Sequence, residues 1–239
     1  MTVFDERIET LREAMRAEHI DFYLIPTADD HASEYVSDYY KVRNYYAGFT
    51  GSAGTLLIGM GMAGLWTDGR YFIQAENQLA GSQVRLFRMG SADEPTLVEY
   101  LRENLPTGGT LAFDGQVVDL AQGQDYADML ASKQGRILWD HDLAGSLWRE
   151  RPSRSSEPVY ILEEKYTGKS RQKKLEELRQ YLKAKGGDTI LLASLEDIAW
   201  LLNLRGNDVR HTPVFLAFAR IDKEKVNLYA DSNAFSKEI

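Results

Sequence analysis

Apolar positions in the first part of the chain recur at the spacing of a helix. Four of them lie three or four residues apart within residues 2–16, namely Phe4, Ile8, Leu11 and Met15. Residues at this spacing share one face of an α-helix, and a threonine such as Thr2 is typical of the position that caps the first turn. The pattern therefore predicts an amphipathic helix over residues 2–16 that buries one face.

Short apolar runs and further helical patterns alternate after this helix. Strands are predicted at residues 22–25, 55–58, 65–67, 84–88, 110–113 and 136–139. Helices are predicted at residues 70–79, 95–105 and 120–133, with Pro95 at the first position of its helix. Strands that alternate with helices are typical of a layered α/β domain with a mostly parallel or mixed sheet.

A glycine-rich stretch precedes the predicted hairpin over residues 55–67. Gly48, Gly51 and Gly54 lie three residues apart, and a strand follows them. A Walker loop would need a lysine after its last glycine, and a dinucleotide loop would need a different spacing and a helix next. We therefore interpret these glycines as a sharp turn into the core hairpin, and not as a phosphate site.

A break in composition at residues 151–158 divides the chain. Two prolines bracket polar residues there, which is typical of a linker. We expect a first domain over residues 1–151, a linker over residues 152–158 and the start of a second domain over residues 159–239. The second part repeats the opening order of the first, with a helix at 168–185, a strand at 189–193, a helix at 195–202 and paired strands at 214–219 and 226–230. This order predicts a second domain of similar construction that is incomplete.

Composition narrows the classes of function. The formal net charge of −8 argues against a nucleic-acid surface, which needs a basic patch. The absence of cysteine excludes disulfides and thiolate sites. No apolar run approaches the roughly 20 residues that span a bilayer, and the acidic N-terminus lacks the features of a signal peptide. We expect a cytoplasmic protein with neither a nucleic-acid nor a membrane partner.

Catalytic chemistry is not evident in the residue patterns. Only four histidines occur, and none lies in a zinc motif or a paired arrangement. Ser52 lies in a tight glycine loop, but the surrounding residues do not form the strand–elbow–helix pattern of a serine hydrolase. We predict no catalytic residue and no metal site in this segment.

Two long motifs resemble a known family. The first comprises residues 48–55 and 65–72, with Arg43 and residues 30–35 (Asp-His-Ala-Ser-Glu-Tyr) upstream. The second comprises residues 197–209, followed by residues 213–215 (Pro-Val-Phe). The chain thus resembles, over essentially its whole length, the N-terminal region of three-domain Xaa-Pro aminopeptidases and, more broadly, the creatinase/prolidase N-terminal domain.

This resemblance implies a ribonuclease-H-like α/β fold with a mixed sheet flanked by helices, followed by a second domain of similar type. It also implies that catalysis takes place in a C-terminal pita-bread domain beyond residue 239, on two divalent metals, expected to be manganese. The parent enzyme would remove the N-terminal residue from short peptides with proline second, and this segment would limit substrate access and help to form a homodimer. Two alternatives remain open: a non-catalytic peptide- or protein-binding module of the same type, and the N-terminal part of a prolidase- or creatinase-like hydrolase.

Six polar side chains are candidates for positions near the substrate or at an interface. They are His31, Arg43, Asp68, Arg70, Arg205 and His211. For Arg70 the alternative is an internal pair with an aspartate that pins the hairpin to its helix, and for the last two it is a loop whose polar groups are satisfied internally. The four tryptophans, Trp66, Trp139, Trp148 and Trp200, are expected in the core or at a domain interface.

Overall fold

The computed structural model describes all residues from 1 to 239, and these form two compact units. The first unit comprises residues 1–29 and 40–152, and the second comprises residues 30–39 and 153–239. The chain therefore passes into the second unit twice. Residues 30–39 lie inside the range that the sequence assigns to the first domain, yet they pack in the second unit.

A six-stranded mixed sheet forms the centre of the first unit, in the order β4-β3-β2-β1-β5-β6. Its strands are β1 (Phe22–Pro26), β2 (Thr55–Gly59), β3 (Ala63–Thr67), β4 (Val84–Arg88), β5 (Thr110–Phe113) and β6 (Arg136–Leu138). The antiparallel hairpin β2–β3 lies beside β1, which pairs with β5 in parallel on its other edge. The structure therefore confirms a mixed sheet in an α/β unit.

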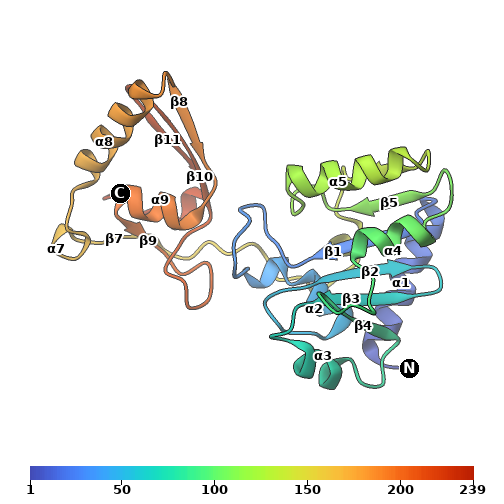
Figure 1. Cartoon of the computed structure of the whole chain (residues 1–239). Coiled ribbons are helices and arrows are strands. Elements are labelled where there is room, and N and C mark those ends of the chain that lie inside the picture. Colours follow the sequence, from blue (N-terminus) through green and yellow to red (C-terminus); the bar gives the residue numbers. More distant parts are fainter. The chain divides into compact units, whose positions relative to one another are not determined.

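Helices cover both faces of this sheet (Figure 1). They are α1 (Val3–Ala17), α2 (Val42–Ala47), α3 (Phe72–Leu79), α4 (Leu97–Asn104), α5 (Leu120–Ala131) and α6 (Leu143–Ser146), and a 3₁₀ turn, η1, spans Asp38–Tyr40. The helices α1, α2, α3 and α6 contribute to the core on one face, whereas α4 and α5 cover the other. Each face of β1 is thus buried, which explains its uninterrupted apolar run.

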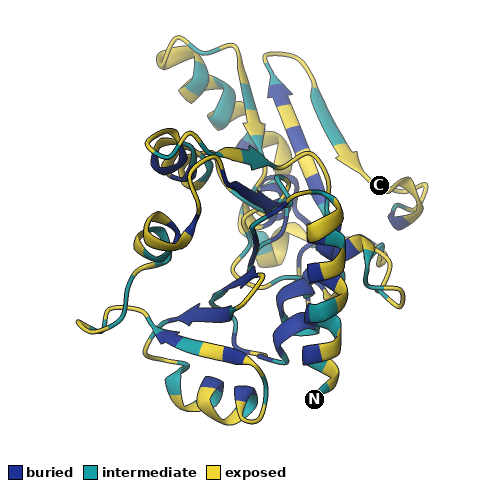
Figure 2. Ribbon diagram, turned by 90° about the vertical axis from the view of Figure 1, so that its right-hand side faces the viewer, coloured by how far each residue is buried: buried dark blue, intermediate teal, exposed yellow.

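The first helix forms as its periodicity predicts. Ile8, Leu11 and Met15 are fully buried on one stripe, and Figure 2 shows this stripe against an exposed outer face. Thr2 and Asp5 make a reciprocal capping box, in which the Asp5 carboxylate accepts a hydrogen bond from the Thr2 backbone N–H at 2.7 Å. This backbone hydrogen bond is the main reason why the pKa of Asp5 lies below its usual value.

A three-stranded antiparallel sheet forms the core of the second unit, in the order β11-β10-β8, beside a two-stranded ribbon of β7 and β9. The strands are β7 (Tyr160–Ile161), β8 (Thr189–Leu192), β9 (Leu204–Arg205), β10 (Ala217–Asp222) and β11 (Val226–Ala230). The helices are α7 (Glu164–Thr167), α8 (Arg171–Ala184) and α9 (Leu195–Leu202), and a 3₁₀ turn, η2, spans Ser232–Ala234. Apolar residues of α8 and α9 pack against one face of the three-stranded sheet.

Several boundaries differ from those that the sequence pattern predicts. Pro95 precedes the N-cap Thr96 and is not the first residue of α4, because the Thr96 side chain accepts a hydrogen bond from the Glu99 N–H and so fixes the start of the helix. The short helices α2 and α6 were not predicted, since segments of four to six residues show no complete hydrophobic period. The strand expected to begin at residue 214 begins at Ala217.

The tryptophans divide into buried and exposed positions. Trp66 is buried, as expected, and Trp148 is half-buried. In contrast, Trp139 and Trp200 are 62% and 52% exposed, so neither is a core residue of its unit. Residue type alone did not reveal this, because a tryptophan is also common on surfaces that bind other molecules.

Candidate functional site

The six residues singled out from the sequence fall into two sets. Arg43, Asp68 and Arg70 belong to the first unit, whereas His31, Arg205 and His211 belong to the second.

Arg43 lies beneath the glycine-rich loop. It projects from α2, donates a hydrogen bond from Nη2 to the Gly51 carbonyl and places its guanidinium 4.6 Å from the centre of the Phe49 ring. A β-carbon at Gly54 would lie 3.0 Å from Arg43 Nη1, and Gly54 has φ of +153°. Glycine is therefore required at position 54, where the loop passes over this side chain, which agrees with the interpretation of the loop as a turn and not a phosphate cradle.

Arg43 is a buried cation, since only 5% of the residue is exposed and no carboxylate pairs with it. Its Nε and Nη1 atoms have no hydrogen-bond acceptor in the structure. Burial lowers the pKa of Arg43 to about 10, so the guanidinium still carries its charge at neutral pH. Its contacts indicate that Arg43 anchors the loop from inside and does not present its charge on the surface.

Asp68 and Arg70 form a bidentate pair in the turn between β3 and α3. Arg70 Nε and Nη2 donate to the two carboxylate oxygens of Asp68, each at 2.9 Å. The Arg70 side chain is 65% exposed, and its hydrogen bond lowers the pKa of Asp68 below the usual value. The internal pairing that the sequence left as an alternative for Arg70 is thus present.

Side-chain hydrogen bonds hold the glycine-rich loop next to this pair. The hydroxyl groups of Ser52 and Tyr71 lie 2.6 Å apart, and Thr67 Oγ1 donates to the Ala53 carbonyl at 2.7 Å. The hydroxyl of Ser52 is therefore engaged by a tyrosine and not by a histidine. This arrangement supports a rigid loop and not an activated serine.

His31 packs inside the second unit. Its Nδ1 lies 3.0 Å from the Ala193 carbonyl oxygen, its Nε2 lies 3.3 Å from an Asp30 carboxylate oxygen, and its ring stacks on Phe218 at 4.3 Å. Asp30 also pairs with Arg154. These contacts attach residues 30–39 to the end of β8 and to the outer face of β10.

A cavity of about 230 Å³ opens beside His31. Its lining includes the carboxyl-bearing Asp208 and Asp231 and the aromatic rings of Phe218 and Tyr229. Both carboxylate oxygens of Asp208 already have hydrogen-bond donors. They accept hydrogen bonds from the N–H groups of Glu157 and Leu216, each at 2.8 Å. The main role of Asp208 is thus to join the start of the second unit to the segment before β10.

Arg205 and His211 have different surroundings. Arg205 Nη1 donates to the carbonyls of Ala199 and Leu204 at 2.7 and 2.8 Å, and so caps the C-terminal end of α9. His211 is exposed and has φ of +64°, in a turn closed by a bridge between Val209 and Thr212. The structure does not bring these two side chains into a common hydrogen-bond network.

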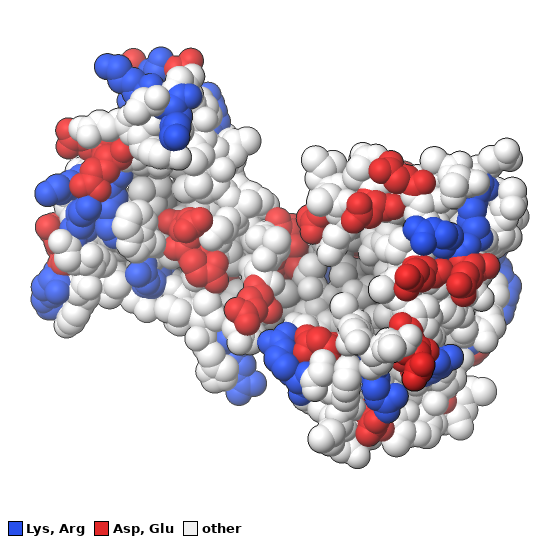
Figure 3. Space-filling view, viewed as in Figure 1, with Lys and Arg blue, Asp and Glu red and all other residues white.

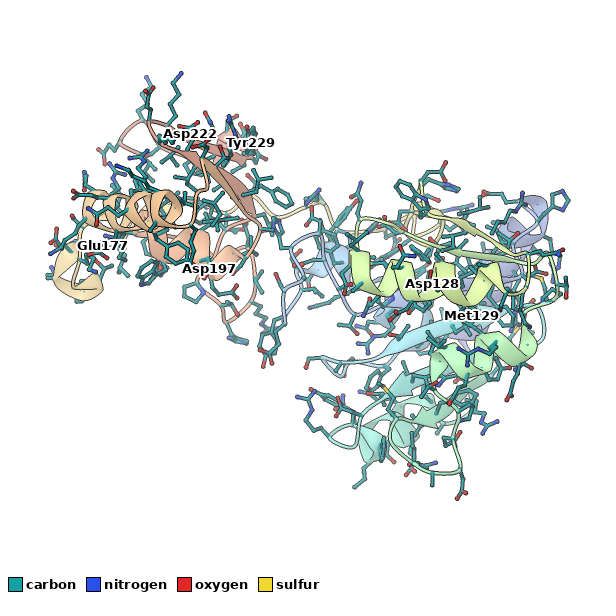
Figure 4. All side chains as sticks on the ribbon, turned by 45° about the horizontal axis from the view of Figure 1, so that its top comes forward. Asp128, Met129, Glu177, Asp197, Asp222 and Tyr229 are labelled. Atoms are coloured by element: carbon teal, nitrogen blue, oxygen red, sulfur yellow. The ribbon has the colours of Figure 1, made fainter.

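The charged side chains show no arrangement suited to a metal ion. Across residues 1–239, no group of three or more His, Cys, Asp or Glu side chains is placed to hold one. Basic and acidic side chains are interspersed on the face shown in Figure 3. In Figure 4, Glu177 on α8 and Asp197 on α9 lie on separate helices, and Glu177 pairs with Lys169. None of the helices combines the length and the apolar character that a bilayer crossing requires.

The sequence pattern does not reveal two features of the structure. One is Lys174, a lysine that is only 2% exposed, and the other is a surface groove where Arg7, Tyr45 and Trp148 stack. Lys174 lies among charged residues of α8, where the pattern predicts exposure. The groove joins residues that are more than a hundred positions apart, so no local signal reveals it.

Comparison with known proteins identifies matching families for both parts of the chain. The family description "Creatinase/Prolidase N-terminal domain" matches residues 7–137, and a second family with the same description matches residues 150–239. Relatives align along nearly the whole chain. The probable Xaa-Pro aminopeptidase P of Talaromyces marneffei is 38% identical over 236 residues, which is 98% of this chain and 36% of that protein. Aminopeptidase P2 of Arabidopsis thaliana is 35% identical over 242 residues, which is 99% of this chain and 34% of that protein.

A solved structure matches the whole chain as well. It is the X-prolyl aminopeptidase of Caenorhabditis elegans, described as a cytosolic enzyme with a di-nuclear active site. The two share 31% sequence identity with a TM-score of 0.92, and the match covers 100% of this chain and 40% of that one. The chain therefore spans two fifths or less of the length of these relatives.

Proposed function

Because the chain belongs to the creatinase/prolidase N-terminal domain family, we propose that it is the N-terminal, non-catalytic portion of an Xaa-Pro aminopeptidase. The observation that carries this proposal is the likeness to the C. elegans enzyme, which extends over every residue of the chain at a TM-score of 0.92. The whole protein would release the N-terminal residue from peptides that have proline second. Residues 1–239 would support this reaction without performing it.

We propose that the metal-dependent chemistry takes place in another part of the whole protein. The C. elegans relative is described as having a di-nuclear active site. In residues 1–239, no group of three or more His, Cys, Asp or Glu side chains is placed to hold a metal ion. We assign the two divalent ions, which we propose to be manganese, to a part of the protein outside these residues. No step of the hydrolysis passes through a residue described above.

The proposed role of residues 1–239 is to shape access to the reaction centre. Asp68, Arg70 and His211 are the members of the predicted set that reach the surface, so we place them near the substrate or at an interface. His31, Arg43 and Arg205 hold the scaffold instead, through their contacts with main-chain carbonyls. The likeness to a cytosolic enzyme supports a cytoplasmic location, and a homodimer that acts on short proline-containing peptides completes the proposal.

An assay of the isolated chain tests this proposal. We expect residues 1–239 to release no amino acid from a proline-second peptide in the presence of Mn²⁺, because no carboxylates and imidazoles converge on an ion. The measurement is a release assay by chromatography, with a longer form of the protein as the positive control. Turnover by the purified 239-residue chain would contradict the proposal.

The second unit supports the further proposal that the second domain is incomplete within these residues. Its strands β8, β10 and β11 have the antiparallel order of β1, β2 and β3 in the first unit, and α8 precedes β8 as α1 precedes β1. In the first unit, α4 and α5 cover the second face of the sheet. The corresponding face of the second unit bears Leu191, Phe218 and Tyr229, which are 74%, 39% and 56% exposed.

We propose that a segment outside residues 1–239, within the additional length of the relatives, covers this face. Burial of a leucine side chain stabilises a protein by roughly 2 kcal/mol. The proposal therefore predicts that Leu191→Gln lowers the free energy of unfolding more in a longer form of the protein than in the 239-residue chain. The substitution should change the free energy of unfolding of the 239-residue chain by less than about 0.5 kcal/mol. In a longer form of the protein it should cost about 2 kcal/mol, measured by urea unfolding. Equal effects in the two forms would refute the idea that the face becomes covered.

A further inference from the structure

A groove of about 400 Å³ lies on the first unit, and its lining includes no residue of the glycine-rich loop over residues 48–54. This volume is within the range of about 300–1,000 Å³ that is typical of small-molecule sites. Its walls come from the start of α1, from α2 and from the segment after α6. The lining residues are Val3, Glu6, Arg7, Thr10, Tyr45, Tyr46, Leu147, Trp148, Arg149 and Glu150.

A stack of planar side chains forms the centre of the groove. The Arg7 guanidinium lies 3.9 Å from the centre of the Tyr45 ring, and the Tyr45 and Trp148 rings lie 4.7 Å apart at an angle of 19°. Arg7 Nη1 also donates to the Tyr45 carbonyl at 2.8 Å. Because two contacts fix its orientation, the guanidinium loses little conformational freedom when it binds a ligand, and it has further N–H groups to donate.

Charges of both signs surround this stack without compensating each other. Arg7 and Arg149 are basic, Glu6 and Glu150 are acidic, and none of the four takes part in an ion pair across residues 1–239. In contrast, other arginines of the same unit, such as Arg12, Arg85 and Arg88, each pair with a glutamate. The groove therefore offers a cation and an anion beside an apolar surface.

We propose that this groove binds a zwitterion with an apolar side chain, namely a free α-amino acid or a dipeptide. Arg7 pairs with the carboxylate through the planar fork that suits this group. Glu150, with Glu6, attracts the ammonium group, and the apolar side chain lies against Trp148 and Leu147. A neutral or singly charged ligand would leave part of this arrangement without a partner.

The site is independent of the function proposed above, because none of its residues is placed near the substrate there. A free amino acid and a dipeptide share the recognised groups, so the two are distinguished by experiment. A nucleotide is disfavoured because the groove carries two carboxylates beside its two guanidinium groups.

Titration calorimetry of the 239-residue chain tests the proposal with defined probes. L-Phenylalanine and L-phenylalanyl-glycine represent the two sources, while N-acetyl-L-phenylalanine lacks the ammonium group and L-phenylalaninamide lacks the carboxylate. We expect saturable binding of at least one zwitterion, and about tenfold weaker binding of the two incomplete probes, since a charge-assisted hydrogen bond contributes about one power of ten. Failure of both zwitterions to bind would overturn the proposal.

Substitutions locate the binding in this groove. Arg7→Met keeps an apolar stem beside Tyr45 and should weaken binding of the zwitterion about tenfold, as should Glu150→Gln at an exposed position that does not support the fold. Arg16→Met is the matched control, because Arg16 is an exposed arginine in the last turn of the same helix and should leave binding unchanged.

Circular dichroism verifies the fold of each variant. If Arg7→Met fails to fold, Glu150→Gln still tests the site. The fluorescence of Trp148 gives a second test, and a Trp148→Phe variant identifies the signal of this tryptophan. Unchanged affinity in Glu150→Gln together with fluorescence that does not respond at Trp148 would overturn it. The assays do not measure peptide hydrolysis, so their outcome is separate from that of the activity test.

Discussion

Replacing Trp66 with alanine is expected to lower the free energy of unfolding of the first unit by about 4 kcal/mol, because truncation of a buried tryptophan typically costs 3–5 kcal/mol. Trp66 is 2% exposed and stacks on Phe87 with 3.9 Å between ring centres and an angle of 5° between planes. The edge of Tyr100 contacts both rings, and Trp66 Nε1 donates to the Pro95 carbonyl at 2.9 Å. Alanine would remove the stack and leave this carbonyl without its donor.

Urea unfolding followed by far-ultraviolet circular dichroism measures this loss without relying on tryptophan fluorescence. The matched control is Trp139→Ala, which removes a tryptophan that is 62% exposed and should cost less than about 1 kcal/mol. Trp66→Phe keeps a ring in the stack and should cost about 1–2 kcal/mol, mainly for the hydrogen bond to Pro95. A loss below 1 kcal/mol in Trp66→Ala would contradict the structure of this cluster.

Replacing Lys174 with methionine is expected to destabilise the second unit by about 3 kcal/mol. Lys174 is 2% exposed, and its Nζ donates to the Trp200 carbonyl and to Asn203 Oδ1, each at 2.7 Å. The ammonium also lies 4.2 Å from the centre of the Trp200 ring. Methionine matches the length of the side chain but leaves Asn203 Oδ1 without its lysine donor and the Trp200 carbonyl with only a 3.4 Å hydrogen bond from the Asn203 N–H. The loss of a hydrogen bond from a charged donor costs about 1.5–3 kcal/mol.

The neighbouring Lys173→Met provides the control, since Lys173 is exposed on the same helix and should change the free energy of unfolding by less than about 0.5 kcal/mol. Both variants are compared by urea unfolding. Equal effects of the two substitutions would contradict a stabilising role of the Lys174 hydrogen bonds at the end of α9.

Alkaline pH should widen the difference between the wild type and Lys174→Met. Burial, followed by the charges of Arg205 and Lys169, lowers the pKa of Lys174 from its usual value of 10.5. The folded state then binds this proton less tightly than the unfolded state, so unfolding takes up a proton in the window below pH 10.5 and stability rises as pH rises through it. Urea unfolding at several alkaline pH values should show this rise in the wild type and not in the variant. If the difference in the free energy of unfolding between the wild type and Lys174→Met narrowed with increasing pH, the pKa of Lys174 would be raised and not lowered.

Much of the fold was accessible from the sequence because its signals are local. The helix cap at Thr2 and the hairpin over β2 and β3 each depend on residues that are a few positions apart, so periodicity and turn chemistry place them correctly. Prediction failed for α2 and for the start of α4. A six-residue helix contains too few turns to show a period, and the hydrogen bond of Thr96 outweighed the preference of proline for a first helical position.

The residues of the candidate site also differ in whether the sequence alone could predict their surroundings. The pairing of Asp68 with Arg70 joins two residues of one turn, so the sequence alone offers an internal pair as the alternative for Arg70. The burial of Arg43 under Gly51 and Gly54 could not be read in advance, because it depends on how α2 packs against the loop. Both arginines belong to one motif, yet their surroundings give them different roles.

The sequence by itself determined the helices and strands with complete hydrophobic periods, the capped helix ends, the glycine turns and the resemblance to a family, because each depends on residues that are neighbours along the chain. Only the tertiary structure decided which charges are buried, which meet a partner and which line a groove. Lys174 and Lys173 are adjacent in one helix, but one lies in the core and the other in solvent. Likewise, Arg7 and Trp148 flank Tyr45 only because α1 and the segment after α6 pack beside α2. The energy of a charged group depends on the atoms around it in space, and packing brings those atoms from distant parts of the chain.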